Sequence, residues 1–98
     1  MRYFVYILRC SDNTLYTGIS NDLKKRMATH KLGKGSKYVR ARLPFKLIYF
    51  KQKDNKSSAL KEELFIKKLS KLEKEDLISK KITGKLKESI IKEINLDL

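Results

Sequence analysis

The sequence predicts an α+β fold in which helices flank a small, mostly antiparallel three-stranded sheet, in the order β-β-α-β-α-α with a further helix at the C-terminus. Two short apolar runs lie on either side of the turn-forming stretch SDNT, and a third strand-like run, FKLIYFK, follows Pro44. Helical patterns occupy the segments between and after these runs. With 98 residues, of which 41% are hydrophobic, the chain suits a single domain, 1–98.

A β-hairpin is predicted for the N-terminal segment. Residues 3–9, YFVYILR, are apolar on both faces, as expected of a central strand, and residues 15–19, LYTGI, form the return strand. Asp12 and Asn13 lie between the two strands and supply the turn, because their short polar side chains bond nearby backbone groups. Gly18 indicates a bulge or a close backbone approach.

Each strand of this hairpin carries a tyrosine, Tyr6 and Tyr16, and the turn decides whether the two share a face. A three-residue turn puts both side chains on one face, whereas a two- or four-residue turn sends them to opposite faces. Asn13 suits the left-handed position that a three-residue turn contains. The tyrosines are therefore either two core residues or two halves of one site.

A helix is predicted to begin at Asn21, a good N-cap, and to stop at Gly33, a glycine of the kind that follows a helix end. Arg26 and His30 are four residues apart on one flank of this helix. The segment from Gly33 to Pro44 is expected to be a basic loop. A lone helical histidine is more often a surface residue than a functional one.

The third strand is predicted over residues 45–51. Strict alternation divides its side chains between two faces, with Phe45, Leu47 and Tyr49 on one and Lys46, Ile48 and Phe50 on the other.

Three helices are predicted after this strand. An amphipathic helix covers residues 57–69, with a buried stripe formed by Leu60, Leu64 and Leu69, and with Phe65 nearby. Ser70 and Glu73 match the capping-box pattern, so a second helix begins there. Gly84 breaks that helix, and a last one covers residues 85–95.

The charge of the chain favours a polyanion as its partner. The formal net charge is +13, and the block Lys24–Lys46 holds nine Lys or Arg and no acid. We expect nucleic acid to bind there. The candidate contacts are Lys24, Lys25, Lys34, Lys37, Arg40 and Arg42, together with Tyr38, which could stack on a base, and Lys67 as a further phosphate contact.

Several classes of protein are excluded or disfavoured. No apolar run approaches the roughly 18 residues of a membrane span, and the N-terminus shows no secretory pattern, so a cytoplasmic protein is expected. A monomer is favoured, although the sequence does not decide the oligomeric state. The lone Cys10 cannot form an internal disulfide. The sequence offers no Cys/His cluster, no phosphate-binding glycine fingerprint and no Ser-His-Asp set.

Five motifs in order resemble the GIY-YIG nuclease domain. Phe4-Val5-Tyr6 stands where GIY would be, and Tyr16-Thr17-Gly18 stands where YIG would be. The resemblance continues through SNDLKKR and His30, through GKGSKYVRARLPFKLIY, and through ALKEELFIK at residues 59–67. It spans about residues 2–80 and is closest to the small stand-alone bacterial members of the YhbQ type, which leaves residues 81–98 as a C-terminal helical extension.

The resemblance implies a metal-dependent endonuclease that hydrolyses DNA phosphodiester bonds. By position, Tyr6 corresponds to the tyrosine proposed to activate water, Tyr16 to the second site tyrosine, and Arg26 to the arginine that faces the scissile phosphate. His30 corresponds to a histidine present in some branches. Glu63, not Glu62, corresponds to the carboxylate that holds one divalent metal ion, expected to be Mg²⁺.

This set is chemically coherent. An arginine fork stabilises the charge that develops on phosphate oxygens, and Mg²⁺ needs few protein ligands because water and substrate fill its other positions. Either Tyr6 or His30 could accept the proton from water.

The sequence departs from the family pattern at three places. Phe4 replaces the glycine of GIY, Thr17 replaces the isoleucine of YIG, and no asparagine lies between Asn55 and Asn95, although some members use one beyond the metal glutamate.

Two alternatives to an endonuclease stay open, a nucleic-acid-binding domain without turnover and a basic accessory protein of RNA or of a ribonucleoprotein. Arg26 could be one more cation of its helix, and Glu63 could merely pair with Lys67.

Overall fold

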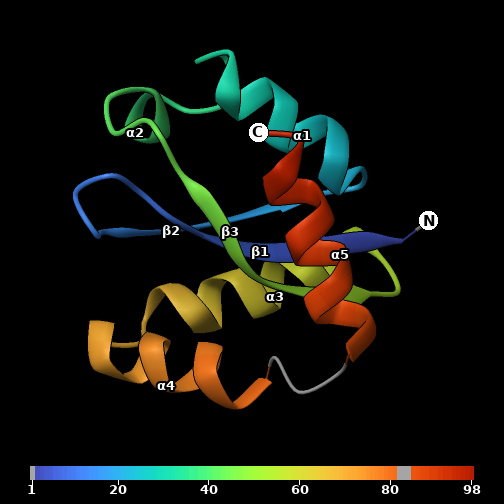
Figure 1. The fold of residues 1–98 in the computed structure, drawn as a ribbon. Coiled ribbons are helices and arrows are strands. Elements are labelled where there is room, and N and C mark those ends of the chain that lie inside the picture. The colour runs from blue at the N-terminus through green and yellow to red at the C-terminus, as the bar shows by residue number, and fades with distance from the viewer. Residues whose placement is uncertain (1, 82–84) are drawn as a thin grey trace.

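The computed structural model describes residues 2–81 and 85–98, and it confirms the predicted α+β fold. The elements are β1 (Tyr3–Arg9), β2 (Leu15–Ser20), α1 (Leu23–Lys31), α2 (Lys37–Arg40), β3 (Lys46–Lys53), α3 (Lys56–Lys67), α4 (Lys71–Lys81) and α5 (Lys85–Leu96). The three strands form one antiparallel sheet in the order β2-β1-β3. Figure 1 shows helices on both faces of this sheet, with α1 and α5 on one face and α3 and α4 on the other.

The sheet separates two hydrophobic cores, because β1 is the central strand and its apolar side chains point to both faces. Tyr6 and Leu8 point into the core under α1, α2 and α5, whereas Val5 and Ile7 point into the core under α3 and α4. The side chains that the helices add to these cores are Leu23, Met27, Val39 and Ile94 on the first face, and Ala59, Ile66 and Ile78 on the second.

The β1–β2 hairpin has the register that puts both tyrosines on one face. Tyr6 lies opposite Gly18, and Tyr16 lies opposite Leu8. The Cys10 N–H donates to the carbonyl oxygen of Thr14 at 2.9 Å, which leaves a three-residue turn between them. Its last residue, Asn13, has φ 68°, the left-handed conformation expected there.

Helix α1 ends as predicted but begins one residue later. The N-cap is Asp22, whose carboxylate accepts a hydrogen bond from Lys25 N at 3.0 Å, and not Asn21. At the other end Gly33 has φ 76°, and its N–H donates to the carbonyl oxygen of His30 at 3.0 Å. The Lys34 N–H donates to the Thr29 carbonyl oxygen, which completes a Schellman motif.

The expected loop after Gly33 contains a short helix, α2. Ser36 caps it by accepting a hydrogen bond from Val39 N at 3.4 Å, and Val39 is fully buried. One apolar anchor and one cap therefore hold a turn of helix within a stretch that reads as basic loop.

The prediction of which β3 side chains share a face of the sheet is wrong after Leu47. The register of β1 and β3 shifts between Ile7 and Leu8, so that Ile48 is an extra residue on β3. This bulge puts Leu47 and Phe50 into the first core and Tyr49 into the second, so the predicted alternation of Phe45, Leu47 and Tyr49 fails at Tyr49.

The stripe predicted for α3 is also wrong. Leu60, Leu64 and Phe65 are exposed by 39%, 57% and 57%, and the buried residues of this helix are Ala59 and Ile66. Because Ala59, Glu63 and Ile66 recur at helical spacing, the face of α3 that meets the sheet carries a carboxylate among apolar side chains.

The capping box of α4 is confirmed. Glu73 N donates to Ser70 Oγ at 3.2 Å, and Ser70 N donates to Glu73 Oε1 at 2.9 Å. The predicted helix break at Gly84 lies outside the described residues.

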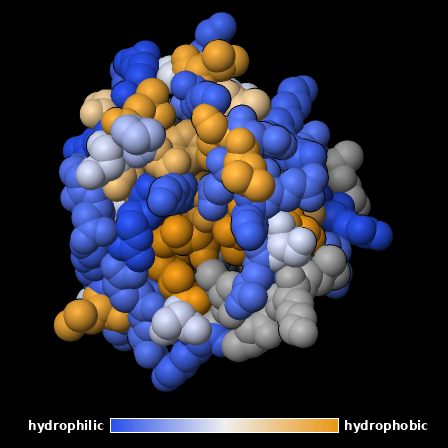
Figure 2. All heavy atoms as spheres, viewed as in Figure 1, coloured by the Kyte–Doolittle hydropathy of each residue, from blue (hydrophilic) through white to orange (hydrophobic). Residues whose placement is uncertain are grey.

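Helix α5 closes the open edge of β3 with a side chain. Asn95 Oδ1 accepts a hydrogen bond from Leu47 N, and Asn95 Nδ2 donates to Leu47 O, both at 2.9 Å. The amide thus replaces a neighbouring strand at this point of the edge. Figure 2 shows apolar side chains gathered on the face of the molecule seen in Figure 1, framed by hydrophilic ones.

Replacing Asn95 tests this edge contact. Asn95→Ala is expected to lower the free energy of unfolding by about 1–3 kcal/mol, because two part-buried backbone groups of Leu47 lose their partner. Urea unfolding followed by circular dichroism measures the change. Leu96→Ala, at a neighbouring side chain that is 77% exposed, is the control and is expected to unfold close to wild type. Equal stability of the two variants would contradict the edge role of Asn95.

Candidate active site

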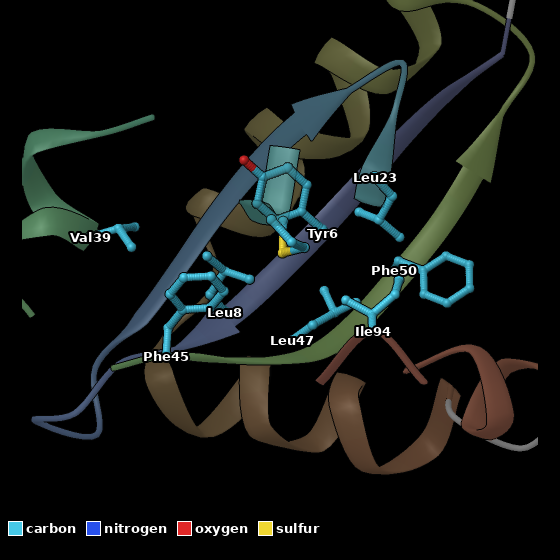
Figure 3. Close-up of a cluster of buried hydrophobic side chains, with 9 residues drawn as sticks. Tyr6, Leu8, Leu23, Val39, Phe45, Leu47, Phe50 and Ile94 are labelled. Atoms are coloured by element: carbon cyan, nitrogen blue, oxygen red, sulfur yellow. The ribbon is translucent and has the colours of Figure 1, made fainter. Parts of the chain in front are cut away.

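A hydrogen bond between two buried rings lies at the centre of the site. The Tyr6 hydroxyl and the Nε2 atom of His30 are 2.8 Å apart, and the two residues are 2% and 1% exposed. Figure 3 shows the ring of Tyr6 among the side chains of the first core, with its hydroxyl oxygen directed away from Leu23 and Phe50. The tyrosine is therefore both a core residue and the carrier of a polar contact.

Two glycines make room for these rings. A Cβ atom at Gly18, opposite Tyr6 on β2, would lie 2.5 Å from the Tyr6 hydroxyl. A Cβ atom at Gly35 would lie 2.6 Å from Nδ1 of His30. No side chain larger than hydrogen fits at either position without moving a ring.

Tyr16 packs against the same pair. Its ring centroid lies 5.6 Å from that of His30 in an edge arrangement and 6.4 Å from that of Tyr6. The ring of Tyr38, from α2, stacks on Tyr16 with a centroid distance of 5.9 Å. The structure thus brings together the two predicted tyrosines and the lone histidine, from β1, β2 and α1.

Charges from two helices act on Tyr6. Burial raises the pKa of Tyr6 far above its usual value, and the neighbouring Tyr16 and the negative charge of Glu63 raise it further, while Arg26 lowers it. Arg26 lies one helical turn before His30 and is partly buried, and among the described residues its guanidinium has no hydrogen-bond or ion-pair partner. Both charges therefore lie within electrostatic reach of the phenol.

His30 is held in its neutral form. Burial, and after it the positive charge of Arg26, lower its pKa from 6.5 to about 4. The Nδ1 atom of His30 is buried and has no hydrogen-bond partner within the described part of the chain. A neutral imidazole that contacts a phenol through Nε2 can accept the phenolic proton there.

Glu63 belongs to the other helix layer, and its charge acts on Tyr6. It stands on α3, which packs against β1 and β2, and its side chain is 15% exposed. Lys67 Nζ lies 3.4 Å from its carboxylate, so the simple ion pair considered from the sequence is present. The neighbouring Glu62 differs, since Lys51 and Lys53 neutralise it at 3.2 Å and 3.5 Å.

The structure brings no cluster of metal ligands together. Within residues 2–81 and 85–98, no group of three or more His, Cys, Asp or Glu residues could hold a metal ion. Any metal at Glu63 would depend on that one carboxylate together with water and substrate.

Some cations of the basic block form ion pairs within the protein, and others do not. Lys24 pairs with Glu93 at 3.5 Å, and Arg42 pairs with Asp12 at 3.0 Å and lies over the ring of Tyr38. The exposed cations of the block with no ion pair to a described residue are Lys25, Lys31, Lys34, Lys37, Arg40 and Lys46. Arg42 and Tyr38, two of the predicted nucleic-acid contacts, therefore contact each other and the hairpin turn.

Sequence reasoning missed Gly35 and Asp12. Gly33 alone is sufficient to end α1, so a second glycine two residues later was a signal that another group approaches the backbone. Asp12 gave no such signal, because it was already explained as a turn residue.

Comparison with known proteins shows the family to which this chain belongs. A sequence model described as the GIY-YIG catalytic domain matches residues 2–76. The chain belongs to the GIY-YIG family. Among the described residues, no helix has the length and apolar character that crossing a bilayer requires.

GIY-YIG relatives of similar size are known in bacteria. A UPF0213 protein of Oceanobacillus iheyensis is 51% identical over 77 residues, which cover 79% of this chain and 90% of the relative. A UPF0213 protein of Clostridium perfringens is 48% identical over 93 residues, or 95% of this chain and 98% of the relative. The solution NMR structure of a UPF0213 protein of Bacillus halodurans is 39% identical and covers 91% of this chain and 94% of its own, with a TM-score of 0.57.

The lone histidine allows a direct test of its pKa. We expect the His30 ring signals in proton NMR to titrate near pH 4 and not near 6.5, because burial and Arg26 disfavour the imidazolium. The folded-state pKa lies below the unfolded one, so the stabilising contribution is present above pH 6.5 and is lost as the pH falls toward 4. The loss amounts to about 3 kcal/mol between pH 7 and pH 4. A midpoint at or above pH 6 would contradict the buried site.

Gly35→Ala tests the packing around His30. The added methyl group meets the imidazole, so we expect a loss of about 1–3 kcal/mol in unfolding free energy. In a His30→Ala background the same change should cost much less, because the obstructing ring is gone. Thermal and urea unfolding of the four proteins of this cycle give the coupling. Equal costs in both backgrounds would show that Gly35 does not serve the histidine.

Proposed function

We propose that this protein is a metal-dependent endonuclease that hydrolyses DNA phosphodiester bonds. The observation that carries the proposal is the Tyr6–His30 hydrogen bond of 2.8 Å, formed where the charges of Arg26 and Glu63 both act on the phenol. A structural core has no need of a tyrosine, a histidine and two opposite charges around one point. Membership of the GIY-YIG family supports the same conclusion.

A proton relay is the mechanism that this geometry supports. The raised pKa of Tyr6 makes the neutral phenol its resting form, so Tyr6 is a poor base on its own. As water attacks phosphorus, its proton moves to the Tyr6 oxygen while the phenolic proton moves to Nε2 of the neutral His30. The P–O bond to the leaving nucleoside oxygen breaks in the same step, and that oxygen takes up a proton from solvent.

Arg26 has two roles in the proposal. Its guanidinium offers a planar fork to the phosphate oxygens and stabilises the charge that builds on them. A bound phosphate would in turn offset the effect of Arg26 on His30, and so raise the proton affinity of the imidazole during the reaction. Substrate binding would thereby prepare the acceptor of the relay.

Glu63 is the residue that would hold the divalent ion. Its hard oxygen ligands suit Mg²⁺, which retains several waters and binds through one or two carboxylates together with substrate phosphates. The ion would add positive charge at the phosphate oxygens. Lys67 would have to release the carboxylate, and its ammonium would then be free to contact phosphate.

The exposed cations of α1, of α2 and of the segment between them are the proposed DNA contacts. Lys25, Lys34, Lys37 and Arg40 have no ion pair to a described residue. Lysines bind the backbone as point charges, so affinity would be salt-dependent and would carry little sequence information.

A cleavage assay with matched variants tests the proposal. Nicked, branched and single-stranded DNA is incubated with Mg²⁺, and the rate is compared among variants at equal folding. Tyr6→Phe and Glu63→Gln are each expected to lower the rate by about 10²–10⁴-fold. Tyr49→Phe and Glu62→Gln are the controls, because these residues lie in the second core and in a lysine pair, and they should cut like wild type.

Three outcomes would contradict the proposal. Cleavage that survives in Tyr6→Phe and Glu63→Gln would come from another site or a contaminant. Equal losses in the control variants would indicate a general defect of folding. Salt-sensitive binding without cleavage of any DNA would assign the protein to nucleic-acid binding without turnover.

A further inference from the structure

Arg42 lies in the basic block, yet its side chain is engaged within the protein. Its Nε donates to Asp12 Oδ2 at 3.0 Å, and its Nη1 donates to the Tyr38 carbonyl oxygen at 3.1 Å. Its guanidinium carbon lies 3.8 Å from the centroid of the Tyr38 ring. A guanidinium held flat by these partners acts through its plane as well as through its charge.

The ring of Tyr38 contacts both Tyr16 and Arg42. Its ring stacks on Tyr16 at a centroid distance of 5.9 Å and an interplanar angle of 25°. The guanidinium of Arg42 lies over one face of the Tyr38 ring, so that face is not open to a nucleotide base.

The stack leads into the candidate active site. Tyr16 is partly exposed on an edge strand, and its ring meets that of His30 at 5.6 Å. At the other end Asp12 belongs to the hairpin turn, and Ser11 N donates to the Arg42 carbonyl oxygen at 3.0 Å. The turn therefore fixes Arg42, Arg42 fixes Tyr38, and Tyr38 limits the rotation of Tyr16.

We propose that Arg42 and Tyr38 are positioning residues that hold the Tyr16 ring in the active site, and that neither binds nucleic acid directly. The inference rests on the proposed function for its catalytic consequence. Its structural part, that Arg42 orders Tyr16 through Tyr38, stands independently of it.

Arg42→Lys separates positioning from charge. The variant keeps the formal charge of the chain but cannot lie flat over Tyr38 with Nε and Nη1 both bonded. It is expected to lower kcat by about tenfold to a hundredfold with little change in KM. Lys37→Ala, at an exposed cation of α2, is expected to show the reverse pattern, with a raised KM and an unchanged kcat.

Variants of Tyr38 provide a second test of the positioning role. Tyr38→Phe keeps the stacked ring and should retain the wild-type kcat, whereas Tyr38→Ala should lower it as Arg42→Lys does. Since both changes break one stack, the double variant Arg42→Lys/Tyr38→Ala should be no worse than Tyr38→Ala alone. A raised KM alone in Arg42→Lys would overturn the proposal, as would equal losses in Tyr38→Phe and Tyr38→Ala.

A structural readout without nucleic acid keeps the two proposals distinguishable. The free wild-type protein should show nuclear Overhauser contacts between the Tyr16 and Tyr38 rings, and Arg42→Lys should lose them. If the wild type cuts no DNA, loss of these contacts in Arg42→Lys still supports the positioning role. Their retention overturns it, whatever the activity.

Discussion

The hydrogen bond between Tyr6 and His30 is the contact on which the rest of the site depends. It requires the hairpin register that places Gly18 opposite Tyr6, and the absence of a side chain at Gly35. It also requires α1 to end directly after His30, as the Schellman motif at Gly33 ensures. A one-residue slip of β2 would turn Tyr16 to the opposite face of the sheet. The local turn chemistry of this small chain thus decides whether its polar groups meet.

Two residues that depart from the GIY-YIG pattern, Phe4 and Thr17, are partly and fully buried, respectively. Phe4 packs edge-on against Phe50 with centroids 6.1 Å apart, at the border of the first core. Thr17 is buried on the other face of β2, because its neighbours Tyr16 and Gly18 face the site. Neither substitution contacts the Tyr6–His30 bond. Asn95, the asparagine farthest along the chain, serves the edge of β3 and does not stand in for a site asparagine.

The three strands, the Gly33 end of α1 and the capping box of α4 could be predicted from sequence, because they depend on neighbouring residues. The sequence left the shared face of the tyrosines open, since that depends on the length of the hairpin turn. Errors arose where a distant contact overrides the local pattern. Ile48 forms a bulge whose existence depends on pairing with β1, and this reverses the facing of Tyr49. The contact between Arg42 and Asp12 could not be foreseen, because the two residues lie 30 positions apart in the sequence. On α3 the leucines gave the more hydrophobic stripe, but the small Ala59 allows the helix to approach the sheet, and this brings Glu63 inward.

The proposed proton relay requires that Nε2 of His30 accepts the hydrogen bond from Tyr6, which leaves the proton of the neutral ring on Nδ1. Long-range proton–nitrogen correlation NMR on nitrogen-15-labelled protein at neutral pH reads this directly, because the chain contains a single histidine. The predicted result is an unprotonated Nε2 whose chemical shift changes in Tyr6→Phe. A protonated Nε2 that is indifferent to Tyr6→Phe would contradict the relay and the function built on it.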